Sequence, residues 1–174
     1  MDKQRIDLLV QTPIFGAIRE ELIAHLVEQA PLVNVKNGAY LFREGDRGTS
    51  MYIIESGRMA ALKKWGTEEY LLKELAQGDC IGEMALFDFL PRSASILSTE
   101  NTTLIEITAT DLLDIYHRDL EQFTLLQMNL GREVTRRLRT ADEQLFHERM
   151  QTTIDGGNVS FQPFLNNKNI RNGD

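Results

Sequence analysis

Residues 41–57 have the sequence LFREGDRGTSMYIIESG, in which glycines interrupt short apolar segments. This pattern of glycines between short apolar segments extends from Gly38 to Gly82, a span that holds seven of the twelve glycines in the chain. Short apolar segments at turn spacings of about ten residues are typical of an antiparallel β-sandwich or barrel. The segments predicted as strands are 40–42, 51–54, 59–62, 70–75, 94–97 and 104–107, with a hairpin tip at 64–68. Turns with positive φ are predicted at Gly38, Gly45, Gly48, Gly57 and Gly78.

Helical periodicity flanks this β region on both sides. Between Leu8 and Ala30 apolar residues recur at helical spacing and predict short helices, with Pro13 interrupting the pattern. Thr110 and Asp111 predict a helix cap before Leu112. From Asp119 to Met150 an apolar stripe runs along about eight turns. Its members are Leu120, Phe123, Leu126, Leu130, Val134, Leu138, Ala141 and Leu145. The chain is therefore predicted to be mainly β with flanking helices: an antiparallel β-barrel with N-terminal helices and a long C-terminal helix.

These patterns divide the chain into three parts. Residues 1–117 are predicted to form the β domain with its N-terminal helices, and residues 118–150 the long C-terminal helix. Residues 151–174 are rich in Asn and Gly and are predicted to be a polar, flexible tail. The apolar stripe of the long helix has two interpretations, packing on its own barrel or pairing with a second copy. We predict pairing, as a parallel homodimer through residues 120–148.

Composition and charge exclude several classes of protein. The chain has 174 residues and a net charge of −7. The whole net charge comes from residues 1–117, which contain 11 Lys and Arg and 18 Asp and Glu. An acidic domain binds a phosphate backbone poorly, so nucleic acid is not an expected partner. The only cysteine is Cys80, and there is no apolar run of membrane-spanning length. We therefore expect no disulfide, no membrane and a cytoplasmic location.

The residues best suited to bind a ligand lie in the stretch 82–95, which has the sequence GEMALFDFLPRSAS. A glycine ends a strand, and one turn of helix formers follows, whose free N–H groups favour an anion. Arg92 can grip two phosphate oxygens, Ser93 adds a hydroxyl, and Glu83 can accept hydrogen bonds from sugar hydroxyls. This set suits a ligand with one phosphodiester charge on a ribose. The structural alternatives are an Arg92 paired with Glu83 or Asp88, a Glu83 that caps a helix, and a Ser93 that begins a strand.

Residues 82–95 resemble the phosphate-binding cassette of the cyclic nucleotide-binding domain family, which includes the catabolite activator protein and protein kinase A regulatory subunits. Residues 41–57 resemble the strand signature of that family, and residues 75–79 resemble the lead-in to the cassette. The likeness covers about Phe15 to Met150 and implies that the barrel is a jelly roll. Phe42 departs from the smaller aliphatic residue usual in the signature, and we interpret it as a packing variation.

The resemblance also implies roles for individual residues. Arg92 would pair with the cyclic phosphate, Ser93 would add a hydroxyl hydrogen bond, and Glu83 would accept the ribose 2′-hydroxyl. The rest of the cassette would close around the sugar and phosphate through Gly82, Met84, Ala85 and Ala94. The base would face the long helix, where the nearest residues are Arg137, Thr140, Ala141 and Asp142. The implied ligand is cyclic AMP, with cyclic GMP as the alternative, and no metal.

Several functions lack the residues they need. His25, His117 and His147 are far apart and show no metal-ligand spacing, and the chain has no phosphate-binding loop for ATP hydrolysis. We therefore expect a protein that is not an enzyme. Residues 151–174 are also too few for a helix-turn-helix DNA reader. The predicted function is a cyclic nucleotide sensor that signals through its long helix to a separate effector protein. The alternative is an interaction module whose pocket is vestigial.

Overall fold

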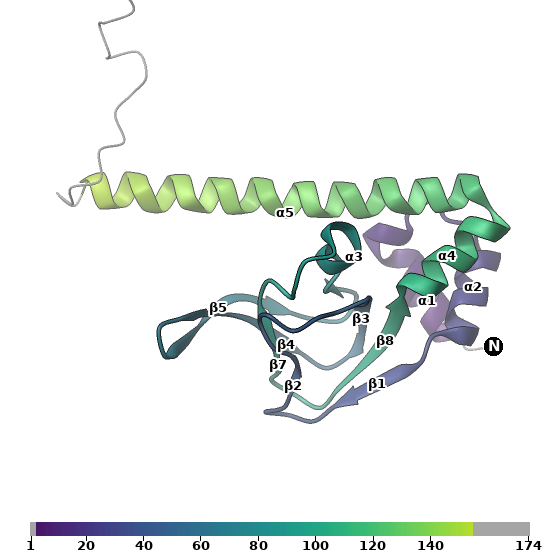
Figure 1. Cartoon of the computed structure of the whole chain (residues 1–174), viewed down its shortest axis with the longest axis horizontal. Helices are drawn as coiled ribbons and strands as arrows, with labels where there is room; N and C mark the ends of the chain where they lie inside the picture. The colour runs from purple at the N-terminus through teal and green to yellow at the C-terminus, as the bar shows by residue number, and fades with distance from the viewer. Residues whose placement is uncertain (1–2, 155–174) are drawn as a thin grey trace, which may run out of the picture. The chain divides into compact units, whose positions relative to one another are not determined.

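The structure of the chain, a computed structural model, describes residues 3–154, with side chains for residues 3–150 (Figure 1). It contains two compact units, divided between Glu133 and Val134. The first unit begins with the helices α1 (Lys3–Gln11), η1 (Pro13–Phe15) and α2 (Glu20–Gln29). The later helices are α3 (Met84–Asp88), α4 (Ala109–Arg118) and α5 (Leu120–Ile154), which runs on into the second unit.

The β region of the first unit consists of two four-stranded antiparallel sheets, one ordered β1-β8-β3-β6 and the other β2-β7-β4-β5. The strands are β1 (Leu32–Val35), β2 (Tyr40–Phe42), β3 (Ser50–Ser56), β4 (Met59–Trp65), β5 (Glu68–Leu75), β6 (Cys80–Ile81), β7 (Ser95–Ser98) and β8 (Thr102–Thr108). Figure 1 shows α1, α2 and α4 gathered at one end of the sheets. The predicted fold class, an antiparallel jelly roll with N-terminal helices and a long C-terminal helix, is confirmed.

Two apolar clusters hold the first unit together. One fills the space between the sheets and includes Ile54, Met59 and Leu104. The other joins the N-terminal helices to β3, β8 and the start of α5, and it includes Phe15 and Leu126. Burial of these apolar side chains is the main force that fixes the sheets and the helices against one another.

The first part of α5 packs on the core of its own domain. Leu126 and Leu130 are fully buried there. Asn129 Nδ2 donates to the carbonyls of Ile14 and Gly16, at 3.2 and 2.8 Å. The first part of the apolar stripe therefore packs on this chain, which was the alternative interpretation. The part from Val134 onward lies in the second unit. A homodimer interface that includes Leu126 and Leu130 is wrong.

Differences from the prediction include one additional strand, the start of α4 and the end of α5. Strand β1 was not predicted: it has only four residues, of which Val35 is buried and Val33 half-buried, and it pairs with β8. Helix α4 begins at Ala109 and is capped by Thr108, whose hydroxyl accepts the Asp111 N–H in a capping box. The cap predicted at Thr110 and Asp111 is thus wrong by two residues. Helix α5 continues to Ile154, so four residues of the predicted tail are helical, and the rest of that tail lies outside the described residues.

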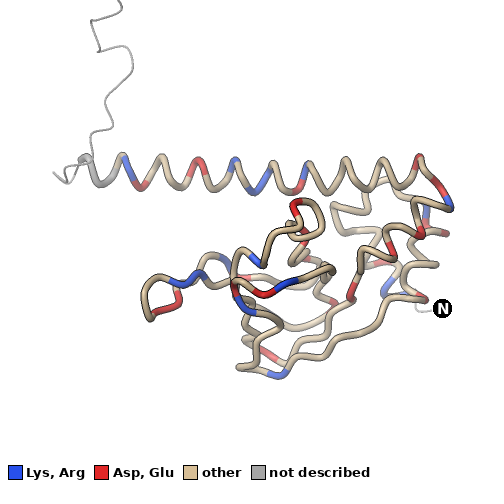
Figure 2. The backbone as a smooth tube through the Cα atoms, in the orientation of Figure 1, with Lys and Arg blue, Asp and Glu red and all other residues tan. Residues whose placement is uncertain are grey.

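Charged residues of both signs lie along the later part of α5 (Figure 2). This pattern is expected for a solvated helix face. Among the described helices, none is long and apolar enough to cross a membrane.

Candidate functional site

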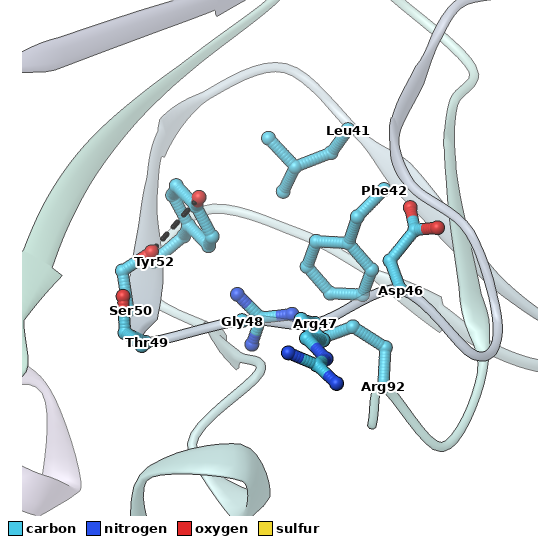
Figure 3. A pocket seen from close by; sticks show the side chains of 9 residues that line it. All are labelled: Leu41, Phe42, Asp46, Arg47, Gly48, Thr49, Ser50, Tyr52 and Arg92. Atoms are coloured by element: carbon cyan, nitrogen blue, oxygen red, sulfur yellow. Dashed lines mark hydrogen bonds between the residues drawn. The ribbon is translucent and has the colours of Figure 1, made fainter. Parts of the chain in front are cut away.

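A cavity of about 530 Å³ lies where β2 and β3 meet the segment that precedes β7 (Figure 3). Its walls come from β2, the β2–β3 loop, the start of β3, and one residue from the predicted cassette, Arg92. The lining residues are Leu41, Phe42, Asp46, Arg47, Gly48, Thr49, Ser50, Tyr52 and Arg92. The lining therefore combines polar side chains, two aromatic rings and a buried cation.

The backbone of Arg92 is fixed to the β2–β3 loop. Its N–H donates to the Asp46 carbonyl at 2.8 Å, and its carbonyl accepts the Gly45 N–H at 2.9 Å. The loop itself is a tight turn, in which Asp46 Oδ2 accepts the Arg43 N–H at 2.8 Å. Asp46 thus closes the turn through its side chain and holds the Arg92 backbone through its carbonyl.

The Arg92 side chain turns inward and is only 5% exposed. Its Nη1 donates to the Gly82 carbonyl at 2.9 Å, and its Cζ lies 4.2 Å from the Phe42 ring centre and 5.8 Å from the Tyr52 ring centre. Its Nε is buried and has no hydrogen-bond partner among the described residues. A buried donor without an acceptor is costly, so the geometry favours an acceptor from outside the chain.

The electrostatic surroundings leave Arg92 charged but unpaired. Burial lowers the pKa of Arg92 from its ordinary value, and electrostatic interactions with Tyr52, Glu106 and Glu83 raise it. An arginine keeps its charge at neutral pH in such surroundings. Among residues 3–150 Arg92 forms no salt bridge. The alternative in which it pairs with Glu83 or Asp88 as a structural arginine therefore does not hold.

Tyr52 belongs to a small network behind the guanidinium. The Ser50 hydroxyl donates to the Tyr52 oxygen at 3.0 Å, and the Tyr52 hydroxyl donates to Glu106 Oε1 at 3.1 Å. Burial raises the pKa of Tyr52, which keeps the hydroxyl protonated at neutral pH. The network fixes the Tyr52 ring beside the Arg92 guanidinium.

Two glycines make room for the guanidinium. A Cβ atom on Gly82 would collide with Arg92 Nη1, and a Cβ atom on Gly48 would collide with Arg92 Nε, Cζ and Nη2. Gly82 has positive φ, +79°, whereas Gly48 does not, so the positive φ predicted for Gly48 is wrong. The reason for glycine at position 48 is close approach: any side chain there would occupy the space of the guanidinium.

The predicted cassette residues other than Arg92 are not among those that line this cavity. Glu83 is 1% exposed and precedes α3, close enough for its charge to raise the pKa of Arg92. Ala85 is buried, Ala94 is half-buried, and Met84 and Ser93 are exposed, with the Ser93 hydroxyl 3.8 Å from Met84 Sδ. The structure thus brings Gly82, Glu83 and Arg92 together at the site and places Met84 and Ser93 at the surface.

The predicted base-side residues lie on α5 in the second unit. They are Arg137, Thr140, Ala141 and Asp142, and the Thr140 hydroxyl donates to the Arg136 carbonyl at 3.2 Å. Their assignment to the base stays a prediction.

Sequence reasoning did not find several residues of the pocket. Phe42 was interpreted as a packing variation, but its ring forms the surface on which Arg92 lies. Ser50 and Tyr52 alternate along β3 with the buried Met51 and Ile53, so the two polar side chains share the face toward the cavity. That alternation is the signal that could have found them. Arg47 gave no signal beyond its place next to Gly48.

No group of three or more His, Cys, Asp or Glu among the described residues could hold a metal ion.

The family model of the cyclic nucleotide-binding domain matches residues 32–119, and the chain belongs to this family. It is similar to the cyclic AMP receptor protein of Thermus thermophilus, with 35% identity over 135 residues, covering 77% of this chain and 61% of the relative. The chain thus spans less than two thirds of that relative.

The solved structures that share the fold include two cyclic nucleotide-binding domains. A co-crystal of the regulatory domain of Toxoplasma gondii PKA with cAMP matches at a TM-score of 0.61 and 28% identity, covering 65% of this chain and 43% of the other. A cyclic nucleotide-binding domain from Methylobacillus flagellatus matches at a TM-score of 0.74, covering 84% and 83% of the two chains. At 20% identity, this second match supports the fold alone.

Proposed function

We propose that this chain is a regulatory protein, not an enzyme, that binds cyclic AMP at the Arg92 pocket and signals its occupancy through α5. The observation that carries this proposal is the buried Arg92, which lines a cavity of about 530 Å³ and whose Nε has no partner among the described residues. A buried guanidinium is well suited to a phosphodiester, because it offers several donors in one plane. The names of the Thermus and Toxoplasma proteins support cyclic AMP over cyclic GMP.

In this proposal Arg92 binds the cyclic phosphate and Glu83 accepts the ribose 2′-hydroxyl. Glu83 is suited to that role, since it is buried and lies beside Gly82, whose carbonyl already holds Arg92. The remaining cassette residues, Met84, Ala85, Ser93 and Ala94, would surround the sugar and phosphate. A ligand that binds one arrangement of the cassette more tightly than another shifts the equilibrium between them. The size of the shift is set by the difference between the two affinities. A separate effector protein would sense the change.

The test of ligand class is a calorimetric titration with cyclic AMP, cyclic GMP and 2′-deoxy cyclic AMP. We expect the 2′-deoxy analogue to bind about 5- to 150-fold more weakly than cyclic AMP, because a buried carboxylate then loses its donor.

Glu83→Gln should weaken cyclic AMP binding by a similar factor, whereas Glu100→Gln, in a surface pair with Arg58, should have no effect. Equal affinity for cyclic AMP and its 2′-deoxy analogue would remove Glu83 from this role. No binding of any nucleotide would favour the vestigial pocket.

We also propose a parallel homodimer through the part of the stripe that lies beyond Val134. Leu138 and Leu145 are seven residues apart on α5 and are 59% and 46% exposed. Apolar residues at this spacing can pair along a helix seam. Sedimentation should give twice the chain mass of 19.9 kDa, and Leu138→Glu with Leu145→Glu should give the single-chain mass. Leu113→Glu, at an exposed position of α4, is the control. A single-chain mass for the unmodified protein, with and without ligand, would contradict the dimer.

A further inference from the structure

A second arginine, Arg47, lines the same cavity as Arg92. It follows the turn residue Asp46 in the β2–β3 loop, and its side chain is exposed. Figure 3 shows both arginine side chains at one end of the pocket, beside Gly48. The cavity therefore carries one buried and one exposed cation at the same end.

Arg47 differs from the other exposed arginines of the first unit in having no partner in the part of the chain that the structure describes. Arg43, in the same loop, lies 3.7 Å over the Tyr40 ring and pairs with Glu69. Arg58 pairs with Glu100, and Arg118 pairs with Asp114. In a chain with a net charge of −7, carboxylates are plentiful, so an unpaired arginine in a pocket stands out.

The acidic residue closest to Arg47 in the sequence is already engaged. Asp46 also lines the cavity and its charge raises the pKa of Arg92, but its Oδ2 accepts the Arg43 N–H at 2.8 Å and so closes the turn. Two guanidinium groups at one end of a cavity repel each other, and an anion bound between them would relieve that repulsion. The free Nε of Arg92 and the unpaired Arg47 are separate observations that favour the same kind of ligand group.

We infer that Arg47 is a second phosphate-binding residue of this pocket. It would hold the phosphate from the solvent side while Arg92 holds it from the buried side. The inference rests on the proposed function. It adds a phosphate-binding group that lies outside the cassette, in the β2–β3 loop. Arg47 would also create a local positive potential at the mouth of an acidic domain, which helps an anionic nucleotide approach against the overall field.

The experiment compares Arg47→Gln with Arg43→Gln in calorimetric titrations with cyclic AMP and cyclic GMP. Both variants remove one positive charge from one exposed loop, so they change the overall field equally, but only Arg47 lines the cavity. We expect Arg47→Gln to weaken binding about tenfold and Arg43→Gln to change it less than about twofold. Arg47→Gln should also reduce the dependence of affinity on salt concentration. Arg47→Lys, which keeps the charge but not the planar fork, should fall between the unmodified chain and Arg47→Gln.

The outcomes separate the two hypotheses. If the unmodified chain binds a nucleotide and the two glutamine variants have the same affinity and the same salt dependence, the role of Arg47 is wrong and the proposed function stands. If the unmodified chain binds neither nucleotide, both are wrong. Urea unfolding of each variant checks that the fold is intact, and no large change is expected from an exposed side chain.

Discussion

Arg92→Ala should lower the affinity for cyclic AMP by roughly 30- to several-thousand-fold, equivalent to about 2–5 kcal/mol. The loss is large because the buried phosphate would then face a cavity without its cation. The Nε of this arginine is also buried without a hydrogen-bond partner among the described residues. Calorimetry at a fixed salt concentration measures the change directly.

Two companion variants make the Arg92 result specific. Arg92→Lys keeps the charge but has no planar fork to reach two oxygens, so it should recover only part of the lost affinity. Arg43→Ala, which removes an exposed arginine stacked on Tyr40, should leave binding unchanged. Urea unfolding separates loss of binding from loss of folding, since Arg92 also packs on Phe42. Should folded Arg92→Ala bind cyclic AMP as tightly as the unmodified chain, the proposed anchor would be refuted.

Gly48→Ala should weaken cyclic AMP binding roughly 5- to 150-fold, since forcing atoms into a packed site costs about 1–3 kcal/mol. The new Cβ would collide with three atoms of the Arg92 guanidinium, so the guanidinium must leave its place above Phe42. The backbone of Gly48 is not left-handed, and alanine can adopt it without strain. The same overlap exists without ligand, so the unfolding free energy should fall by about 1–3 kcal/mol as well, and affinity is compared on protein that urea unfolding shows to be folded.

A double variant tests whether Gly48 acts through Arg92. In the Arg92→Ala background, Gly48→Ala should cause no further loss of affinity, because the group it displaces is gone. Gly131→Ala is the matched control, since a Cβ atom there would meet nothing within 4 Å. An additive loss in the double variant would mean that Gly48 acts on the ligand or the fold by another route.

The fold was largely predictable because its signals are local. Glycines at turn spacings and brief apolar segments predicted six of the strands, and the helical stripe predicted α5. Strand β1 was missed because it has only four residues, in which Leu32 interrupts the alternation of Val33 and Val35 with Asn34. The cap of α4 was misplaced because Thr108 and Thr110 are both residues that can cap a helix. The capping-box spacing of Thr108 and Asp111 is the feature that decides between them.

The site was only partly predictable because most of it depends on contacts between distant segments. Arg92 and Glu83 belong to a contiguous motif, and a motif can be recognised without coordinates. Gly48 has no such signal: a glycine that makes a turn and a glycine that makes room for a guanidinium look the same in a sequence. Phe42 was noticed only as a departure from the usual aliphatic residue, and its contact with Arg92 required the fold.

The stacking of Arg92 on Phe42 has a thermodynamic consequence. A long, charged side chain normally loses rotamer freedom when it captures a ligand, and that loss subtracts from affinity. Here the ring of Phe42, the carbonyl of Gly82 and the bare backbone of Gly48 already confine the guanidinium. The pocket is therefore preorganised, and an arriving nucleotide need not freeze its principal anchor.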